Sequence, residues 1–531
     1  MSFNDRDIVI EDLNVRVVYS AGEGDRSVLA ARDITAKSQL MLVDHPLLIA
    51  LDTPHLAVNC YSCFRTPREL PRDVQGQAPS LQRCSGCKVV RFCDKICQKQ
   101  AWLYHRLECK LYARLYPRIL PSNVRAMVRL LKQQKAGQIP PEEWMHLLSL
   151  ESHMEEIGRA GGERWEDLSL MTQGIKAYSK SDQSPELILR LLCILTINSF
   201  TLTNFISEPM GLALHPKTSQ FNHSCRPNAF VRFDVFKSVS APEKSGQHHI
   251  SVHALRDIHE NEEITLGYVD GTYPFEKRQQ ELKERYFFTC SCELCTKERE
   301  AAANPSHTTS IVNSKAKEAE QYAEQVHSDV QSEPGLEYTQ VDKIKQAMAG
   351  LAGTASWRLH HYPWPQLRTQ LLAGLIGLGK YSEALLQSAI MARVTHPAMF
   401  EQAYHPLRLV QMFALWNLCN SCMDDEEERE ETGRPWDARR FRMLDLLSCV
   451  VLDDIHKALV DGVRINGYLE HMIEQALRRP PREARTWDNF QDKPAQAREV
   501  AWAWLDELIR AQLRKEGVSQ TIVDSAMTNQ G

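Results

Sequence analysis

The sequence lacks a long, uninterrupted apolar run. Its most apolar stretch, residues 187–205, is broken by Arg190, Asn198 and Asn204, so it predicts a buried segment and not a membrane span. The first seven residues also lack the basic and then apolar regions that form a secretory signal. We therefore expect a chain without membrane association that works in the nucleus and the cytoplasm.

A strong charge of either sign is also missing. The chain has 63 Lys and Arg against 68 Asp and Glu, and its net charge of −5 gives no general reason to bind nucleic acid or an anionic membrane. Residues 60–110 differ, because they hold ten basic side chains and only four acidic ones. We interpret this stretch as a solvated basic module, and a partner-binding surface is the alternative.

What the sequence does contain is cysteine. Its 531 residues, 43% of them apolar, are enough for two to four domains with buried cores. They include 15 cysteines. Because no export to an oxidising compartment is expected, these cysteines favour metal binding over disulfides.

Eight potential ligands with metal-binding spacing lie within residues 60–109. Two tetrahedral zinc sites need eight such ligands, and four protein ligands per ion leave no position for water, so both sites are predicted to be structural. Metal binding would also supply folding energy that so small a module cannot obtain from an apolar core. The ligands are Cys60-x2-Cys63, Cys84-x2-Cys87, Cys93-x3-Cys97 and His105-x3-Cys109.

A second polar cluster occupies residues 222–225, with the sequence Asn-His-Ser-Cys. Such a run favours a ligand-binding turn over a regular helix or strand, because Asn and Ser compete for backbone hydrogen bonds. A purely structural turn is the alternative. The alternating apolar residues at 229–236 predict a strand directly after it.

A further Cys-x-Cys-x2-Cys motif begins at Cys290 and is one ligand short of a tetrahedral site. Cys225 is the best candidate for the fourth ligand. A third zinc ion would then hold this motif against the turn at 222–225. It would also bring Tyr286 and Phe288 to that turn.

The remaining pattern predicts strands mainly near the start of the chain and helices in most of the rest. Residues 297–307 predict a polar linker and 424–431 a solvated acidic loop, and Cys419 and Cys422 are interpreted as core cysteines. Strands are predicted at 8–10, 15–19, 28–31, 39–43, 250–254 and 262–268, and helices at 123–134, from 141, from 185, and at 274–285, 315–326 and 364–378.

Several independent motifs occur in the order found in one protein family. The spacing of the eight ligands resembles a MYND zinc finger. A MYND finger inserted in a split SET domain is the arrangement of the SET and MYND protein-lysine methyltransferases, and the resemblance covers residues 8–297. The motifs that resemble a SET domain with its post-SET zinc site are Asn198-Ser199-Phe200, the run 222–225, Glu262-Glu263 to Tyr268, and Cys290-x-Cys292-x2-Cys295.

The resemblance implies an α+β fold. Its parts would be a split SET β-fold with an inserted MYND zinc finger and a helical insertion, a post-SET zinc site, and an all-α, tetratricopeptide-like C-terminal domain. The implied boundaries are 1–59 for the N-terminal part of the SET domain, 60–109 for the finger, 110–195 for the insertion, 196–275 for the core SET domain, 276–297 for the post-SET segment and 308–531 for the helical domain.

The resemblance also assigns the ligands of three zinc ions. In this family the two sites of the finger interleave, so that each ion takes ligand pairs from separate parts of the module. The implied sets are Cys60, Cys63, Cys93 and Cys97 for one ion, Cys84, Cys87, His105 and Cys109 for another, and Cys225, Cys290, Cys292 and Cys295 for the third.

The implied reaction is methyl transfer from S-adenosylmethionine to the nitrogen of a protein lysine. Tyr268 is the implied catalytic tyrosine, and Tyr286 and Phe200 would line the lysine channel. One position departs from the family: Ser27 stands where a second turn glycine is expected after Gly24, and its Cβ would crowd the cofactor. The implied cofactor-binding residues are Arg26, Glu151, His153, Asn198, Ser219, Phe221, Asn222, His223, Tyr268, Tyr286 and Phe288.

The implied partners are histones or other protein substrates, and a proline-containing peptide at the finger. Nucleic acid would be a secondary partner at most, and we expect a monomer. The alternative function is a catalytically weak or inactive scaffold. Such a scaffold would recruit protein partners through the finger and the helical domain.

Overall fold

The structure is a computed structural model of the 531-residue chain. Tertiary contacts divide it into two units, one of residues 1–269, 279–292 and 466–469, and one of residues 270–278, 293–465 and 470–531. The residues that the structure describes are 15–19, 26–67, 79–204, 207–234, 249–303, 314–332, 338–354, 357–425, 438–460, 467–477, 490 and 492–528.

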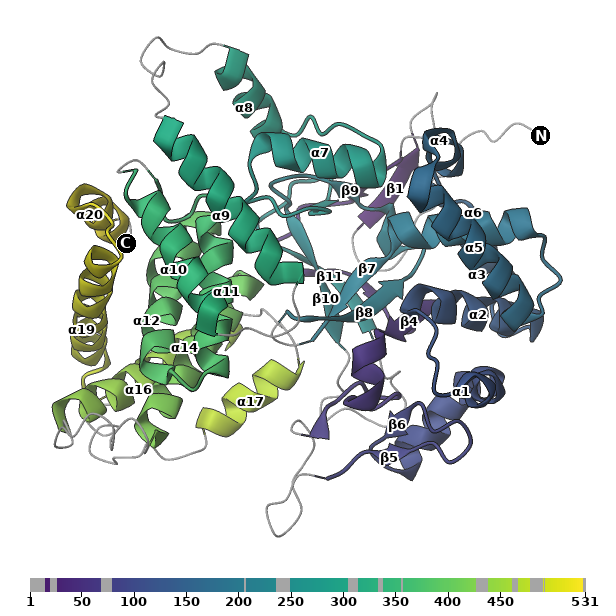
Figure 1. Ribbon diagram of the computed structural model, residues 1–531, viewed down its shortest axis with the longest axis horizontal. Coiled ribbons are helices and arrows are strands. Elements are labelled where there is room, and N and C mark those ends of the chain that lie inside the picture. Colours follow the sequence, from purple (N-terminus) through teal and green to yellow (C-terminus); the bar gives the residue numbers. More distant parts are fainter. Residues whose placement is uncertain are drawn as a thin grey trace. The chain divides into compact units, whose positions relative to one another are not determined.

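The strands in the described part of the first unit form small sheets of two or three strands each (Figure 1). Strand β11 pairs antiparallel with β10 and β3, β8 pairs antiparallel with β4 and β7, and β9 pairs in parallel with β12. The strands are β1 (Val15–Tyr19), β2 (Arg26–Ala30), β3 (Gln39–Val43), β4 (Leu48–Leu51), β5 (Gln82–Arg83), β6 (Arg91–Phe92), β7 (Phe200–Thr203), β8 (Pro209–Leu214), β9 (Asn222–His223), β10 (Ala229–Asp234), β11 (His249–Ala254) and β12 (Thr265–Leu266).

Helices of the first unit cover one side of these sheets. Helix α2 packs against β4 and β8, and α5 packs against α2 and α6. Ser184 caps α6 by accepting a hydrogen bond from the backbone N–H of Leu187, which the Ser-Pro-Glu start signal predicts. The helices are η1 (Thr53–Ala57), α1 (Lys95–Leu115), α2 (Ser122–Lys135), α3 (Pro141–Leu148), α4 (Met154–Ala160), α5 (Gly162–Ser179), α6 (Pro185–Asn198) and η3 (Thr218–Gln220).

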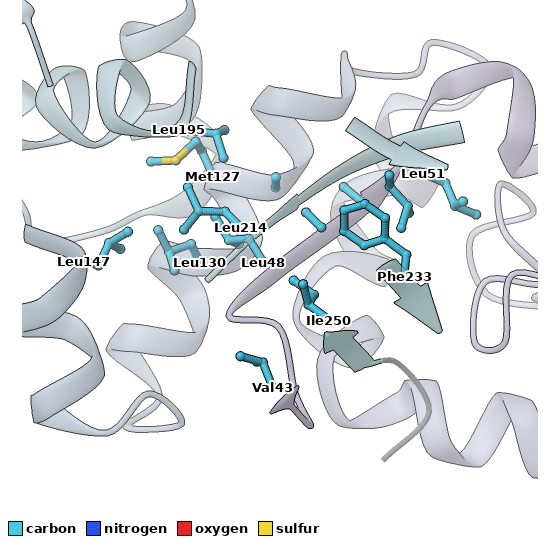
Figure 2. Close-up of a cluster of buried hydrophobic side chains, with 14 of the residues drawn as sticks. Val43, Leu48, Leu51, Met127, Leu130, Leu147, Leu195, Leu214, Phe233 and Ile250 are labelled. Atoms are coloured by element: carbon cyan, nitrogen blue, oxygen red, sulfur yellow. The ribbon is translucent and has the colours of Figure 1, made fainter. Parts of the chain in front are cut away.

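The core of the first unit lies where these helices meet the sheets. Figure 2 shows side chains from α2, α6 and the strands directed toward one another. Burying one such Leu, Ile or Phe side chain contributes about 1.5–3 kcal/mol. The labelled residues are Val43, Leu48, Leu51, Met127, Leu130, Leu147, Leu195, Leu214, Phe233 and Ile250.

The second unit is helical in its described residues. Helices that follow one another in sequence pack together from α9 to α12, and α14 packs against both α12 and α16. The helices are α9 (Ser314–Ser332), α10 (Tyr338–Ala352), α11 (Trp364–Gly377), α12 (Tyr381–Ile390), η4 (Met391–Thr395), α13 (His396–Met399), α14 (Pro406–Asp424), α16 (Ala438–Val460), α17 (Gly467–Leu477), α19 (Pro494–Lys515) and α20 (Gln520–Thr528). The division between the units falls inside helix α7 (Phe275–Tyr286), between residues 278 and 279, and again at the start of helix α8 (Glu293–Ala303).

Two sequence-based expectations are corrected. Residues 297–303 belong to helix α8 and not to a linker, because this stretch consists largely of good helix formers and Lys297 pairs with Glu293 one turn earlier. The strand predicted at 262–268 is reduced to Thr265–Leu266. Before it, Glu262 ends a turn in which its carboxylate accepts hydrogen bonds from Arg256 and from the backbone N–H of His259, and Glu263 forms an isolated antiparallel bridge with Leu29.

Other expectations are confirmed or lie outside the described residues. The strands at 15–19, 39–43 and 250–254 and the helices at 123–134, 274–285 and 364–378 are present within one or two residues. The helix predicted at 315–326 is present as α9, which extends from Ser314 to Ser332. The strand predicted at 8–10, the glycines Gly22 and Gly24, and most of the acidic run at 424–431 lie outside the described residues.

A membrane-spanning segment is not found in the part of the chain that the structure describes. No helix there combines the length and the hydropathy that crossing a bilayer requires. The described part of this apolar stretch, residues 187–204, instead forms most of α6 and the whole of β7. Many of its apolar side chains belong to the core of the first unit, which agrees with the prediction of a buried segment.

Folding stability is expected to decrease in mild acid because of His396. Burial and then the Arg408 guanidinium lower the pKa of His396 from 6.5 to about 4. The unfolded chain takes up a proton at this residue near pH 6.5, whereas the folded chain resists until about pH 4, so stability falls as the pH falls between these values. Protonation of His396 is therefore expected to lower the free energy of unfolding by about 2 kcal/mol between pH 7 and pH 5.

Denaturant unfolding at pH 7 and pH 5 measures this loss, and His396→Gln is the comparison. The variant cannot bind the proton, so the acid-induced decrease in its unfolding free energy should be smaller than in the parent. Equal decreases in the two proteins would show that His396 does not contribute.

Candidate functional site

Three sets of four side chains are placed so that each could hold a metal ion. Within each set the candidate ligand atoms all lie within 4.8 Å of one another. Four soft ligands at such distances fit tetrahedral Zn²⁺ without an open position, which is the chemistry of structural and not of catalytic zinc. The sets are Cys60, Cys63, Cys93 and Cys97; Cys84, Cys87, His105 and Cys109; and Cys225, Cys290, Cys292 and Cys295.

A buried carboxylate, Glu108, stands behind the second set. Its Oε1 lies 3.7 Å from His105 Nδ1, while His105 Nε2 lies 3.4 Å from Cys84 Sγ. Burial opposes ionisation of Glu108, but the Arg129 guanidinium, His105 and the Tyr61 hydroxyl together outweigh it and lower the pKa of this carboxyl to about 2. Arg129 also donates to the carbonyl of Ile49 on β4. The Glu108–Arg129 pair therefore joins α1 to α2 and β4 directly behind the imidazole of the second set.

The third set is built around the turn that follows strand β9. The parallel pairing of β9 with β12 aligns His223 with Leu266, and the backbone N–H of Ser224 donates to the carbonyl of Leu266 at 3.0 Å. The side chain of Asn228 completes the connection, because its Oδ1 accepts from the backbone N–H of Thr265 at 2.8 Å. Through this pairing Tyr268, two residues beyond β12, lies beside the turn.

Aromatic rings gather at this point. The Tyr268 ring lies 5.0 Å from the Tyr286 ring and 5.3 Å from the His223 ring, measured between centroids. Phe288 lies 6.0 Å from His223 and 6.4 Å from Tyr268. Phe287, between the two aromatic residues of the second segment, has a left-handed backbone with φ of 64°. This conformation turns the chain so that Tyr286 and Phe288 both reach the cluster.

The hydroxyl of Tyr268 is fixed and protonated. It donates a hydrogen bond to the carbonyl oxygen of Phe221 at 2.5 Å. Burial, only partly offset by the charge of Arg26, raises the pKa of Tyr268 to about 12. At neutral pH this hydroxyl therefore holds its proton and can offer oxygen lone pairs to a second group.

A chain of hydrogen bonds connects five of the eleven predicted cofactor-binding residues. Arg26 donates to the carbonyl of Ser219 at 2.9 Å, and the Ser219 hydroxyl donates to the carbonyl of Asn198 at 3.0 Å. The Asn198 amide donates to the carbonyl of Glu151 at 2.8 Å. On the other side, the Asn222 amide donates to the carbonyl of Arg26 at 2.5 Å. The structure thus brings five residues from distant parts of the sequence into one connected group.

Arg26 has a buried donor to spare. Its Nε atom is buried and makes no hydrogen bond to the residues that the structure describes. A buried guanidinium N–H without an acceptor is costly, and a carboxylate satisfies it with a charge-assisted hydrogen bond. The donors around Arg26 therefore fit a small molecule that carries a carboxylate, as S-adenosylmethionine does.

His153 and Phe287 meet on the other side of the 286–288 segment. Their rings lie 5.0 Å apart, and the guanidinium of Arg164 lies 5.5 Å from the Phe287 ring. Arg164 also donates to the carbonyl of Glu284 at 2.9 Å. The sequence analysis assigned no role to Phe287 or Arg164, and no sequence signal identified them, because their contact depends on the left-handed turn at Phe287.

Two further predictions concern the ring of Phe200 and the side chain of Ser27. The ring of Phe200 on β7 contacts Phe233 at 6.5 Å between centroids, and within the described residues no ring contact joins it to Tyr268 or Tyr286. Ser27 lies inside strand β2, paired with Val18. The glycine turn before Ser27 lies outside the described residues, so the crowding expected from this residue stays a prediction.

Comparisons with known proteins agree with this arrangement. A family model of the SET domain matches residues 25–269. "SET domain and MYND-type zinc finger protein 6" of Schizosaccharomyces pombe is 27% identical over 342 residues, which are 64% of this chain and 59% of that protein. "N-lysine methyltransferase SMYD2" of Mus musculus is 30% identical over 243 residues, 44% of this chain and 53% of that protein.

A human relative, "Histone-lysine N-methyltransferase SMYD3", is 30% identical over 231 residues, 42% of this chain and 50% of that protein. The chain spans about half the length of the curated relatives it matches. Among solved structures, that of the SET domain of LSMT bound to lysine and AdoHcy aligns over 87% of both chains with 12% identity. Its TM-score of 0.25 is too low to support a structural argument.

Proposed function

We propose that this chain, whose residues 25–269 match the SET domain and which is similar to the SET and MYND lysine methyltransferases, is an S-adenosylmethionine-dependent protein-lysine N-methyltransferase. The observation that carries the proposal is the meeting of Tyr268, Tyr286 and Phe288 beside the turn whose Cys225 completes the third metal set. The unused Nε–H donor of Arg26, whose Nη2 donates to the carbonyl of Ser219, supports binding of a carboxylate near this cluster.

S-adenosylmethionine supplies a methyl group on a sulfonium sulfur, which is already activated toward attack by an amine. The protein must then provide alignment and a neutral lysine. A free lysine has a pKa of about 10.4, so at pH 7 roughly one molecule in a few thousand is neutral. The rings of Tyr268 and Tyr286 exclude water and lower that pKa, and they tolerate the methylammonium product through cation–π attraction.

The Tyr268 hydroxyl orients the amine. Its own proton is engaged with the carbonyl of Phe221, so its lone pairs are free to accept a hydrogen bond from the lysine nitrogen. The amine lone pair forms the new N–C bond as the methyl–sulfur bond breaks, and the surplus proton leaves the nitrogen for solvent. Asn222, Ser219 and Arg26 would hold the methyl donor, and the Phe288 ring would cover its adenine.

We further propose the organisation that this family implies. Residues 60–109 form a MYND finger with two zinc ions, residues 276–297 form a post-SET segment with a third, and the helices after residue 308 form a tetratricopeptide-like domain. The substrates are histones or other proteins. The exposed Trp102 and the basic residues of the finger support a role in recruiting a peptide, with proline-containing peptides as the first to test.

Replacing Tyr268 with Phe tests the proposal. The variant keeps the ring but loses the hydroxyl that orients the amine, so we expect kcat for methyl transfer to fall by about 100-fold or more. Affinity for S-adenosylhomocysteine should change little, because the aromatic packing remains. The measurements are transfer of a labelled methyl group to a panel of protein substrates, and titration calorimetry.

Tyr322→Phe is the matched control, since this tyrosine is exposed on α9 and the chemical change is the same. Equal transfer by the parent and by Tyr268→Phe would remove Tyr268 from its role. Binding of S-adenosylhomocysteine without transfer to any substrate would support the scaffold alternative.

A further inference from the structure

His223 was predicted to bind the cofactor, but both nitrogens of its ring are already engaged. Nδ1 lies 3.0 Å from the backbone nitrogen of Tyr268, and Nε2 lies 3.3 Å from Cys225 Sγ. No ring nitrogen is left for a small molecule. Any contact of His223 with a cofactor would have to come from its main chain.

The tautomer of this imidazole follows from its partners. A backbone N–H can only donate, so Nδ1 must accept the hydrogen bond from Tyr268 and carries no proton. In the neutral ring the proton then resides on Nε2 and points at the sulfur of Cys225. A metal-bound thiolate is a good acceptor for such a donor, because it keeps excess negative charge after coordination.

Other donors surround the same set of sulfurs. The backbone N–H of Cys292 donates to Cys290 Sγ at 3.4 Å, and Nη2 of the buried Arg278 lies 3.7 Å from Cys295 Sγ. Four thiolates and one Zn²⁺ carry a net charge of −2, and donors of this kind offset it. What distinguishes His223 is where its other hydrogen bond leads, because the partner of Nδ1 is the backbone N–H of Tyr268, the proposed catalytic tyrosine.

We propose that His223 is a positioning residue whose imidazole links the third metal set to Tyr268. The chain of contacts runs from the metal through Cys225 Sγ and the imidazole to the backbone N–H of Tyr268. A metal ion at this set fixes the position of Cys225, and the Cys225 thiolate accepts a hydrogen bond from Nε2. The Nδ1 atom accepts a hydrogen bond from the backbone N–H of Tyr268 and so positions the main chain that carries the Tyr268 side chain. The consequence for catalysis rests on the proposed function, whereas the link itself does not.

Two substitutions break the link at opposite ends. In His223→Asn the side-chain oxygen lies near the former Nδ1 and can still accept from Tyr268, but the donor to sulfur is lost. In His223→Gln the amide nitrogen lies near the former Nε2 and can still donate to Cys225, but the acceptor for Tyr268 is lost. His259→Asn is the control, because His259 is exposed in the same unit.

Two readouts do not depend on activity. Hydrogen–deuterium exchange resolved to single residues reports on the Tyr268 amide, and we expect it to exchange about tenfold faster in His223→Gln but not in His223→Asn. Cadmium-113 NMR of the cadmium-loaded protein reports on the sulfurs. The resonance of the third set, identified by its loss in Cys225→Ala, should shift in His223→Asn and stay in place in His223→Gln.

Catalysis should depend on both ends of the link. Each His223 variant is expected to lose about tenfold or more in kcat, because misplacing a reacting group by a fraction of an ångström is costly, while KM for the methyl donor stays nearly constant. An unchanged Tyr268 amide in His223→Gln together with an unchanged cadmium resonance in His223→Asn would overturn the inference. A parent protein that transfers no methyl group would overturn the proposed function alone, since exchange and cadmium NMR would still decide the role of His223.

Discussion

Cys225→Ala is expected to bind two zinc ions in place of three and to lose methyl transfer by about 100-fold or more. Cys225 is the one ligand of its set that comes from the turn after β9, and the other three belong to residues 290–295. Removing it breaks the metal-mediated tie between these segments. Tyr286 and Phe288 would then no longer be held against Tyr268, and the cover over the methyl donor would be lost.

Three measurements test this expectation: the zinc content by elemental mass spectrometry, the binding of S-adenosylhomocysteine, and the rate of methyl transfer. Cys193→Ala is the matched control, since Cys193 is also a buried cysteine of the first unit but belongs to none of the three sets. The control should keep three zinc ions and its activity. Three zinc ions and full transfer in Cys225→Ala would show that the third set is not a metal site on which the reaction depends.

Gly211→Ala is expected to lower the unfolding free energy by about 4 kcal/mol or more, which for many proteins prevents folding. Gly211 lies in β8, paired with β4 on one side and β7 on the other. A Cβ at this position would lie 2.0 Å from the carbonyl oxygen of Ala50 and 3.0 Å from the Cα of Leu51. Both are main-chain atoms of a paired strand, so the clash cannot be relieved by rotating a side chain.

Soluble yield and urea unfolding measure this effect, with Gly377→Ala as the control. A Cβ at Gly377, the last residue of α11, meets nothing within 4 Å, and replacing a helical glycine with alanine stabilises by up to about 1 kcal/mol. An unchanged unfolding midpoint in Gly211→Ala would contradict the close approach of β8 and β4.

Local chemistry made much of the candidate site predictable. Cysteine and histidine at short spacing identify metal ligands without knowledge of the fold, because the two residues of each pair must reach one ion from neighbouring turns of chain. The grouping of the eight ligands at 60–109 came from a family resemblance, since spacing alone allows more than one partition. The pairing of Cys225 with the cysteines of the 290s followed from counting, because three thiolates leave a tetrahedral ion incomplete.

Contacts between distant segments were not predictable in the same way. The position of His223 was identified, but not the use of its ring, because neither Tyr268 nor the Cys225 sulfur could be oriented without coordinates. Strands β4 and β8 were missed, although β4 adjoins a predicted strand. Their sequences, Leu48–Leu51 and Pro209–Leu214, are short and show no clear alternation, so only their pairing identifies them as strands.

The sequence by itself determined which side chains could bind metal and where several helices begin, since metal-ligand spacing and helix-start signals act over a few residues. The tertiary structure decided how those side chains are used. The tautomer of His223, the outward turn at Phe287 and the clash that reserves position 211 for glycine all arise where chain segments far apart in sequence come within contact distance. Hydrogen bonds and steric repulsion act only at such short range, so none of the three could be known before the segments were placed.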